Sequence, residues 1–460
     1  MKTIISFFMI CNYITVYVFA AADHPIAWKD MEDLDLRDIL RSQYLSSANL
    51  YYTQHSINDF HKALYDTEAK TNKEFTMPEP LLHAVEFWLK IYTQYSTQQV
   101  IIFDKRHPDL IYEVSDFRDL YQTSKTLAAY EITLDRVVNR KLNHYKQTFQ
   151  SLIYKKMNKI KKYTQAEQAV LATIKNSYHK HNLFEFSKNI KTQIGQRDNV
   201  IKGLLAAELF FPKMEQIFRS QNLNEDLVRL SLVESSFNLK AVSSADAVGV
   251  WQFLKRSGAE YLRIDPTYNI DERLSPLKST LAAAKLLKRN YKLLKNWPLT
   301  ITSYHHGLKN LRPFIKRTTA SRSTEKIIFD LCRSNSPLGW ASQNYYAEFL
   351  ALLRAEKYKH LFYGVVPTIK NSNHFFFHQL TKKTSAVDIA YKSGISLQEF
   401  HLLNPDVKKL QTKLPKGFWV AIFDPQIDNL DFFTKNHSVR LTQFRRSQNV
   451  NNTGRTQHKL

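Results

Sequence analysis

The stretch that decides the fold reads NEDLVRLSLVESSFNLKAVSSADAVGVWQF and covers residues 224–253. Asn224 followed by two acidic residues is typical of a helix start. Leu227, Leu230 and Glu234 then recur at spacings of three and four, so they share one helix face. This pattern places a carboxyl group on an apolar face near the helix C-terminus, and both surroundings raise the pKa of a carboxyl group. Glu234 is therefore a candidate general acid, with a buried, hydrogen-bonded structural glutamate as the alternative.

Helix signals continue on both sides of this stretch. Ser275 followed by proline predicts a long helix that runs through Leu294. The sequence Asn-Trp-Pro at 296–298 begins a further helix, which Gly307 is expected to end. Upstream, residues 24–195 are polar and helical in period, and they carry no recognisable catalytic motif. We expect a mainly α protein with a helical N-terminal accessory region.

A different pattern occupies residues 374–424. An aromatic, strand-like segment at 375–378 precedes two short helices, the second with a capping box at 396–399, and a strand follows at 418–423. This order predicts a small βααβ module. Residues 437–460 are basic and poor in apolar residues, which predicts a disordered tail.

The N-terminus and the overall charge bear on the location of the protein. Residues 1–22 combine Lys2, a mostly apolar run and three alanines, a pattern typical of a cleaved signal peptide, with a single membrane anchor as the alternative. Cleavage would leave only Cys332, so no intrachain disulfide is expected. The net charge of +23 favours a polyanionic partner. For an exported protein that partner is the cell envelope, through anionic lipid or carboxylate-rich peptidoglycan, and not nucleic acid.

Several motifs stand in a fixed order along the chain. Glu234-Ser-Ser-Phe-Asn is followed by Ser243 nine residues after the glutamate and by Gly-Val-Trp-Gln252 ending eighteen residues after it. Further on comes Tyr304-His-His-Gly. Together these motifs resemble the catalytic core of lytic transglycosylases of the soluble and membrane-bound D types, in glycoside hydrolase family 23. The likeness extends over about 190–355 and implies a lysozyme-like helical domain.

The resemblance also implies a mechanism. Glu234 would protonate the glycosidic oxygen between N-acetylmuramic acid and N-acetylglucosamine. It would then act as base on the muramoyl C6 hydroxyl, which closes to a 1,6-anhydro ring without water. The side chains expected to bind the substrate are Ser243, Gln252, Tyr304, His305 and Tyr345. As alternatives, the serine could cap a turn, the glutamine could be a surface amide, and each tyrosine could belong to the core.

No cofactor or metal ion is expected. His305 and His306 are the one candidate ligand pair, but adjacent helical residues point to different faces. His305 also departs from the family pattern, which has asparagine there. Asp246 replaces a usual glycine, and Leu254-Lys-Arg replaces a usual Met-Pro. These departures leave Glu234 in place and bear on substrate preference and turnover.

The C-terminal module resembles a LysM glycan-binding domain. The best-matching pieces are Leu402-Leu-Asn404-Pro405 and Leu414-Pro-Lys-Gly417. The usual Gly-Asp-Thr after the first strand is replaced by Lys-Lys-Thr at 382–384, and a small packing domain is the alternative.

The sequence thus predicts an exported, monomeric enzyme of the periplasm or cell envelope that acts on peptidoglycan glycan strands and touches the anionic membrane surface peripherally. Its expected parts are a signal peptide at 1–22, a helical region at 23–195, a catalytic domain at 196–355, the LysM-like module at 374–424 and the tail at 437–460. Three alternatives stay open: a hydrolytic muramidase with Asp246 or Asp271 as second carboxylate, an inactive glycan-binding scaffold, and a nucleic-acid binder that is not exported.

Overall fold

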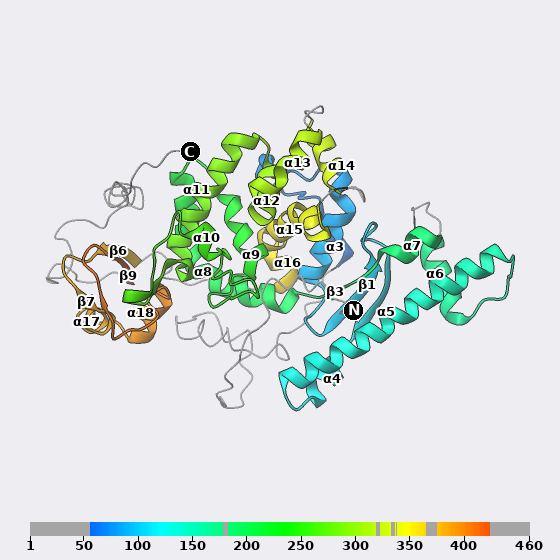
Figure 1. Cartoon of the computed structure of the whole chain (residues 1–460), viewed down its shortest axis with the longest axis horizontal. Coiled ribbons are helices and arrows are strands. Elements are labelled where there is room, and N and C mark those ends of the chain that lie inside the picture. The colour runs from blue at the N-terminus through cyan, green and yellow to red at the C-terminus, as the bar shows by residue number, and fades with distance from the viewer. Residues whose placement is uncertain are drawn as a thin grey trace, which may run out of the picture. The chain divides into compact units, whose positions relative to one another are not determined.

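The computed structural model describes residues 56–177, 183–318, 323–332, 336, 338–364 and 375–423 (Figure 1). The predicted signal peptide and basic tail lie outside the described residues. The described chain forms two compact units. The first unit contains residues 202–293 and 375–423, and the second contains residues 56–201 and 294–364. No helix among these residues is both long enough and apolar enough to cross a membrane.

The first unit contains two long helices, α8 (Arg197–Ser220, from Lys202 onward) and α11 (Pro276–Leu294), several short helical turns and an irregular loop that carries Ser243 and Gln252. Its other elements before the C-terminal module are η5 (Glu225–Arg229), α9 (Leu230–Ser235), α10 (Lys255–Gly258), β4 (Ile264–Asp265), η6 (Pro266–Tyr268), β5 (Ile270–Asp271) and η7 (Glu272–Leu274). The predicted start of α11 after Ser275 and its end at Leu294 are both confirmed. Three alanines at 282–284 are buried in α11, where small side chains allow close packing.

The C-terminal module has the predicted strand, helix, helix, strand order. Its elements are β6 (Phe375–Gln379), β7 (Thr384–Ser385), α17 (Ala386–Lys392), α18 (Leu397–Leu403), β8 (Lys413–Leu414) and β9 (Trp419–Phe423), with β6 antiparallel to β9 and β7 antiparallel to β8. The predicted capping box of Ser396 and Glu399 is present. Asn404 donates to the carbonyl of Ala421 at 2.6 Å and accepts from its N–H at 2.7 Å, so it joins the end of α18 to β9.

This module packs directly on residues 264–278 of the same unit. Val407 forms a β-bridge with Ile270, which belongs to the module's own hydrophobic core. The ammonium group of Lys278 lies 2.6 Å from the Asp406 carboxylate and donates to the Trp419 carbonyl at 2.9 Å. Since Ile270 belongs to the module's core and the Lys278–Asp406 pair is buried, these two parts of the unit share one core.

The second unit is mainly helical and contains a three-stranded sheet. Its elements are α2 (Ile57–Leu64), η3 (Lys73–Phe75), η4 (Glu79–Leu81), α3 (Leu82–Thr93), β1 (Gln99–Asp104), β2 (Ile111–Asp116), α4 (Arg118–Thr123), α5 (Leu127–Met157), α6 (Gln165–Lys175), α7 (Leu183–Asn189), β3 (Ile190–Ile194), α12 (Trp297–His306), α13 (Leu308–Thr318), α14 (Thr324–Cys332), α15 (Trp340–Lys357) and α16 (Lys359–Tyr363). As predicted, Asn296 caps α12, and Gly307 ends it with a φ of 82°.

The sheet corrects the all-helical interpretation of the N-terminal region. Its strands are antiparallel in the order β2-β1-β3, with β1 in the centre. The run Val-Ile-Ile-Phe within β1 is β-branched and aromatic, and it is buried, which suits a central strand. A short apolar run of this kind does not distinguish a strand from a buried helix by periodicity, so the helical reading was wrong here.

Candidate active site

Glu234 lies at the end of a buried helix. The segment that leads to Glu234 begins with the 3₁₀ turn η5, in which the Asn224 side chain accepts a hydrogen bond from the Asp226 N–H at 3.0 Å. It continues directly into α9. Glu234 is the penultimate residue of α9 and is 6% exposed. The expected burial and position near the helix C-terminus are therefore confirmed. The backbone of α9 ends at Ser236 in the left-handed region, with a φ of 48°.

Close packing holds this helix end. A Cβ atom at Gly203 on α8 would lie 2.0 Å from the Ser236 carbonyl oxygen, so only glycine lets α8 approach this turn. The Ser235 hydroxyl donates to the carbonyl of Val250 at 3.1 Å. This bond ties the residue after Glu234 to the loop that carries the other family motifs.

That loop, residues 241–253, is a compact turn stabilised by its own polar groups. Ser243 Oγ accepts hydrogen bonds from the N–H groups of Ala245 at 3.2 Å and Ala247 at 3.0 Å. The turn-capping role of Ser243 is thus observed. Asp246 has a φ of 61°, a conformation that aspartate tolerates better than most residues do. The departure from glycine at this position therefore keeps the turn geometry.

Gln252 occupies a strained position in the same loop. Its φ is 47°, and its amide donates to the carbonyls of Gly249 at 2.8 Å and Ala241 at 3.4 Å. Its Oε1 atom is buried and has no hydrogen-bond partner among the described residues. A left-handed residue with an unsatisfied buried oxygen costs free energy, and such positions concentrate at functional sites. The next residue back, Trp251, anchors the loop by donating to Thr280 of α11 at 2.8 Å.

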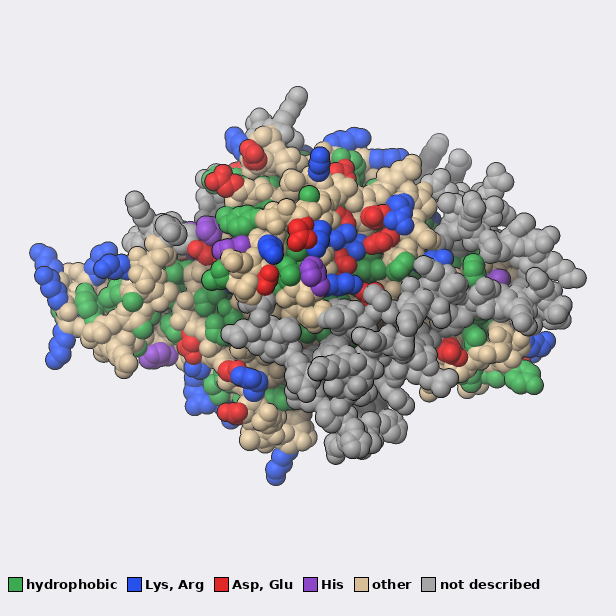
Figure 2. Space-filling model, turned by 180° about the vertical axis from the view of Figure 1, so that it is seen from behind, with side chains coloured by type: hydrophobic (Ala, Val, Ile, Leu, Met, Phe, Trp, Pro, Cys, Tyr) green, Lys and Arg blue, Asp and Glu red, His purple; other side chains and the backbone are tan. Residues whose placement is uncertain are grey.

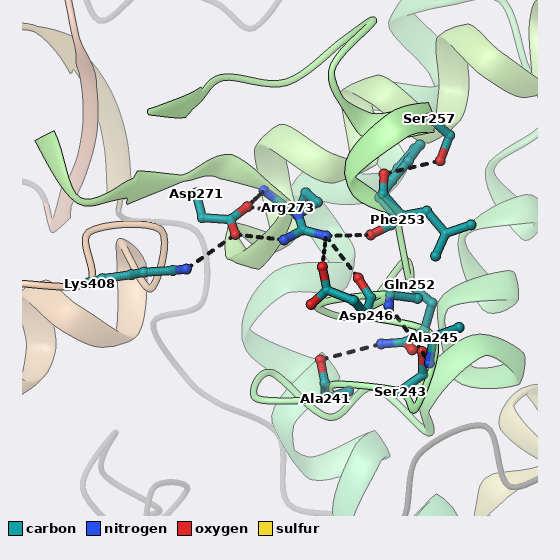
Figure 3. Close-up of polar contacts among 12 residues, drawn as sticks. Ala241, Ser243, Ala245, Asp246, Gln252, Phe253, Ser257, Asp271, Arg273 and Lys408 are labelled. Atoms are coloured by element: carbon teal, nitrogen blue, oxygen red, sulfur yellow. Dashed lines mark hydrogen bonds and ion pairs between the residues drawn. The ribbon is translucent and has the colours of Figure 1, made fainter. Parts of the chain in front are cut away.

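Arg273 joins the loop to the rest of the unit (Figure 3). Its guanidinium donates to the backbone carbonyls of Asp246 at 2.9 Å and Phe253 at 3.2 Å. The same group makes a two-pronged contact with the Asp271 carboxylate, at 3.0 and 2.9 Å. Lys408 of the C-terminal module lies 3.4 Å from Asp271. A chain of charges therefore runs from the module to two points of the loop that carries Ser243 and Gln252, namely Asp246 and Phe253.

This network bears on the carboxylates proposed for hydrolysis. Burial raises the pKa of Asp271, but hydrogen bonds and charges of Arg273 and Lys408 lower it, and the net pKa lies below its usual range. Asp271 is thus an ion-pair partner inside the unit. The carboxylate of Asp246 is largely exposed, 3.9 Å from Arg273. Both carboxylates thus contact Arg273, and Asp271 is also engaged by Lys408.

The remaining expected site residues lie in the second unit. His305 and Tyr345 stack, with ring centroids 4.9 Å apart and an interplanar angle of 19°. Tyr345, on α15, is 1% exposed, whereas Tyr304 is half-buried on α12. Burial, with a smaller contribution from the charge of His306, lowers the pKa of His305 to about 4. His305 is therefore neutral at neutral pH and can both donate and accept a hydrogen bond, as the family's asparagine can.

Residues 215–327 match the family model of the transglycosylase SLT domain. This segment is an SLT transglycosylase domain. It contains Glu234, Ser243, Gln252, Tyr304 and His305, whereas Tyr345 lies outside the matched range. The SLT domain includes residues of both compact units.

Two curated proteins show the same relationship. The membrane-bound lytic murein transglycosylase D of Escherichia coli K12 is 30% identical over 192 residues, which are 41% of this chain and 41% of the relative. The protein of the same name from Escherichia coli O6:H1 strain CFT073 matches to the same extent. The matched part thus spans less than half the length of these relatives.

Sequence reasoning missed three positioning residues of the SLT domain, namely Ser235, Trp251 and Arg273. Ser235 and Trp251 lie inside quoted motifs, but all three residues act on partners 15 to 29 residues away in the chain. The spacing of residues along one helix or turn carries no signal of such contacts. The one available clue was the run Asp-Glu-Arg-Leu at 271–274, which places an arginine directly after two acidic residues.

Proposed function

We propose that this protein is a peptidoglycan lytic transglycosylase that cleaves the bond between N-acetylmuramic acid and N-acetylglucosamine, with Glu234 as acid and then base. The observation that carries the proposal is the burial of Glu234 at the end of α9, tied through Ser235 to the loop that carries Ser243 and Gln252, inside a matched SLT domain.

The proposed reaction needs one carboxyl group. Glu234 donates its proton to the glycosidic oxygen as the bond from that oxygen to the muramoyl C1 breaks, and the leaving strand keeps the proton. The Glu234 carboxylate then takes the proton of the muramoyl C6 hydroxyl while O6 bonds to C1. The carboxyl group is restored, no water is consumed, and the product ends in a 1,6-anhydro ring.

Polar groups of the loop would serve this chemistry by binding substrate. The unpartnered Oε1 of Gln252 is an acceptor fixed in place by the strained backbone, and it suits an amide N–H such as that of a sugar acetamido group. Ser243 keeps its hydroxyl hydrogen for donation because its oxygen accepts the turn N–H groups. Tyr304 and His305 stay predicted glycan-binding residues, since both lie in the matched SLT segment. Tyr345 is 1% exposed, which supports the alternative that it belongs to the core.

Hydrolysis is the main competing reaction, and the geometry favours it less. A hydrolase of the common two-carboxylate type needs a second carboxylate placed for water or sugar attack. Asp271 is engaged by Arg273 and Lys408, and Asp246 projects from an exposed turn. Both carboxylates therefore make contacts within the fold that do not require a catalytic role.

Digestion of purified peptidoglycan in water enriched in heavy oxygen tests the proposal. We expect anhydro-muramic ends without incorporated label, and loss of release with Glu234→Gln. Glu225→Gln is the matched control, because Glu225 lies in the preceding 3₁₀ turn and pairs with Arg219 at the surface. Reducing ends that carry the label would establish a hydrolase instead. Unchanged release by Glu234→Gln would remove this residue from the mechanism.

We further propose that the protein acts as a monomer in the periplasm or cell envelope and that the module at 374–424 binds glycan as a LysM domain does. Tyr391 on α17 supports glycan binding, since it is 86% exposed and can stack on a sugar ring. Tyr391→Ala should weaken sedimentation with intact sacculi and leave the melting temperature unchanged. Equal sedimentation of both proteins would leave the module a packing domain.

A further inference from the structure

The helices α5, α6 and α7 form a helical arm of the second unit, and its tip, residues 154–162, has an unusual surface. From Arg136 to Ala166 the chain has nine lysine and arginine residues and no aspartate or glutamate. Figure 2 shows Lys and Arg side chains gathered with hydrophobic ones at the end of this arm, on the left of the view. Basic and apolar side chains therefore meet on one small surface.

The apolar side chains of the tip are not those that hold the arm together. Phe149 and Leu152 of α5 face inward and pack with residues of α6 and α7 in a buried cluster. In contrast, Tyr154 is 62% exposed, Met157 77% and Ile160 38%. Three large apolar side chains within seven residues remain at the surface, where water contact is unfavourable.

The backbone of the tip is well defined. Helix α5 ends at Met157, and the chain turns at Lys159 with a φ of 56°, while the Ile160 N–H donates to the Lys155 carbonyl at 2.8 Å. The Glu167 carboxylate accepts from the Thr164 N–H and pairs with Lys155 at 2.7 Å. These bonds satisfy the turn and neutralise one of its lysines.

Four lysines of the tip stay exposed and make no ion pair with any described residue; they are Lys156, Lys159, Lys161 and Lys162. Their charge adds to the three exposed apolar side chains beside them. We propose that the tip of the helical arm is a docking surface for a lipid bilayer with anionic headgroups. The lysines would pair with headgroup phosphates while the apolar side chains enter the boundary of the acyl chains.

The mixed surface favours lipid over peptidoglycan as the occupant. Peptidoglycan offers carboxylates to the lysines and sugar rings to Tyr154, but it offers no hydrocarbon to Met157 and Ile160. A bilayer satisfies both kinds of group. The proposal does not depend on catalysis, because the tip contains none of the site residues.

Sedimentation with vesicles tests this proposal on the protein as isolated from an expressing cell. The vesicles contain either phosphatidylcholine alone or an equal mixture of phosphatidylcholine and phosphatidylglycerol. We expect binding to the mixed vesicles, reduced by added salt. Replacing the four tip lysines by glutamine should weaken it by about 100-fold or more, since each lysine near an anionic surface contributes about fivefold.

Two further variants separate lipid docking from a general charge effect. Met157→Ser with Ile160→Ser keeps the charge and should weaken vesicle binding by about tenfold. A control with the same loss of charge changes four other exposed lysines to glutamine, Lys73, Lys292, Lys295 and Lys309. It should retain most of the binding.

Three results would overturn the proposal. The first is equal vesicle binding by the wild type and the lysine variant of the tip. The second is an equal loss in the control variant, which would show a general charge effect. The third is a combined result: the lysine variant of the tip loses sacculus binding, while the Met157→Ser, Ile160→Ser variant binds vesicles as well as the wild type does. That result would make peptidoglycan the occupant. Peptidoglycan digestion in solution should be the same for all of these variants, so failure of this proposal is distinct from failure of the catalytic one.

Discussion

Replacing Arg273 by lysine should lower both the stability of the first unit and the rate of the proposed peptidoglycan cleavage. The guanidinium is 5% exposed and makes four hydrogen bonds, two to the Asp271 carboxylate and two to the carbonyls of Asp246 and Phe253. A lysine ammonium has no planar fork, so it cannot hold the carboxylate by two bonds and also reach both carbonyls.

The magnitude follows from the groups left without partners. Breaking a buried ion pair by removing one partner costs about 3–5 kcal/mol, which is the expectation for Arg273→Met. Arg273→Lys keeps the charge but loses at least one charge-assisted bond, which is worth about 1.5–3 kcal/mol. The free energy of unfolding should therefore fall by about 2 kcal/mol for lysine and by about twice that for methionine, as measured by urea denaturation.

Turnover is the readout that separates positioning from stability alone. Arg273 holds the loop at Asp246, three residues after Ser243, and at Phe253, directly after Gln252. Relaxation of the loop should therefore lower kcat in Arg273→Lys even at a temperature where the variant is fully folded. Arg289→Lys is the control, because Arg289 pairs with Glu260 on the surface and should cost under about 1 kcal/mol without changing kcat. A folded Arg273→Lys variant with wild-type kcat and KM would refute the positioning role.

Three other perturbations have defined outcomes. Gly249→Ala should lower the free energy of unfolding, measured in urea, by about 2 kcal/mol or more. The residue has a φ of 76°, and a new Cβ would lie 2.2 Å from the Arg273 carbonyl oxygen. Lys278→Met should cost about 3–5 kcal/mol by stranding the Asp406 carboxylate, and adding Asp406→Asn should restore part of that loss, which a double-mutant cycle in urea would measure. The neutral His305 should make the free energy of unfolding depend on pH. Its pKa falls from 6.5 to about 4 on folding, so as the pH falls the unfolded chain binds a proton before the folded one does. Its contribution is complete above pH 6.5 and is lost as the pH falls toward 4, by up to about 3 kcal/mol, and His305→Asn should flatten that slope.

Local signals in the sequence predicted much of the helical frame. The proline after Ser275, the asparagine cap at 296, the glycine at 307 and the capping box at 396–399 each place a helix end, because each acts through hydrogen bonds to backbone groups within a few residues. Glu234 at the end of α9 followed from the same kind of local pattern.

What could not be predicted depends on distant residues. In the sheet, β1 pairs with β3, which lies about 90 residues later in the chain, so that Val100 lies opposite Ile194. No periodicity within either strand specifies that pairing. The contacts of Arg273 with Asp246 and Phe253 likewise join separate segments. The role of Ser243 was left between a turn cap and a substrate ligand, and only the cap is visible in the fold.

The contacts of Arg273 also explain how the loop accepts an unusual sequence. Arg273 recognises backbone carbonyls at positions 246 and 253, and these groups are the same whatever side chains stand there. Asp246 can therefore replace the family's glycine if it adopts the left-handed conformation, which it does with a φ of 61°. Gly249 has no such freedom, because its Cα faces the Arg273 carbonyl at a distance that excludes a Cβ. The loop thus tolerates a side chain at position 246, where Arg273 contacts only the backbone carbonyl. It requires glycine at position 249, where another backbone segment packs directly against it.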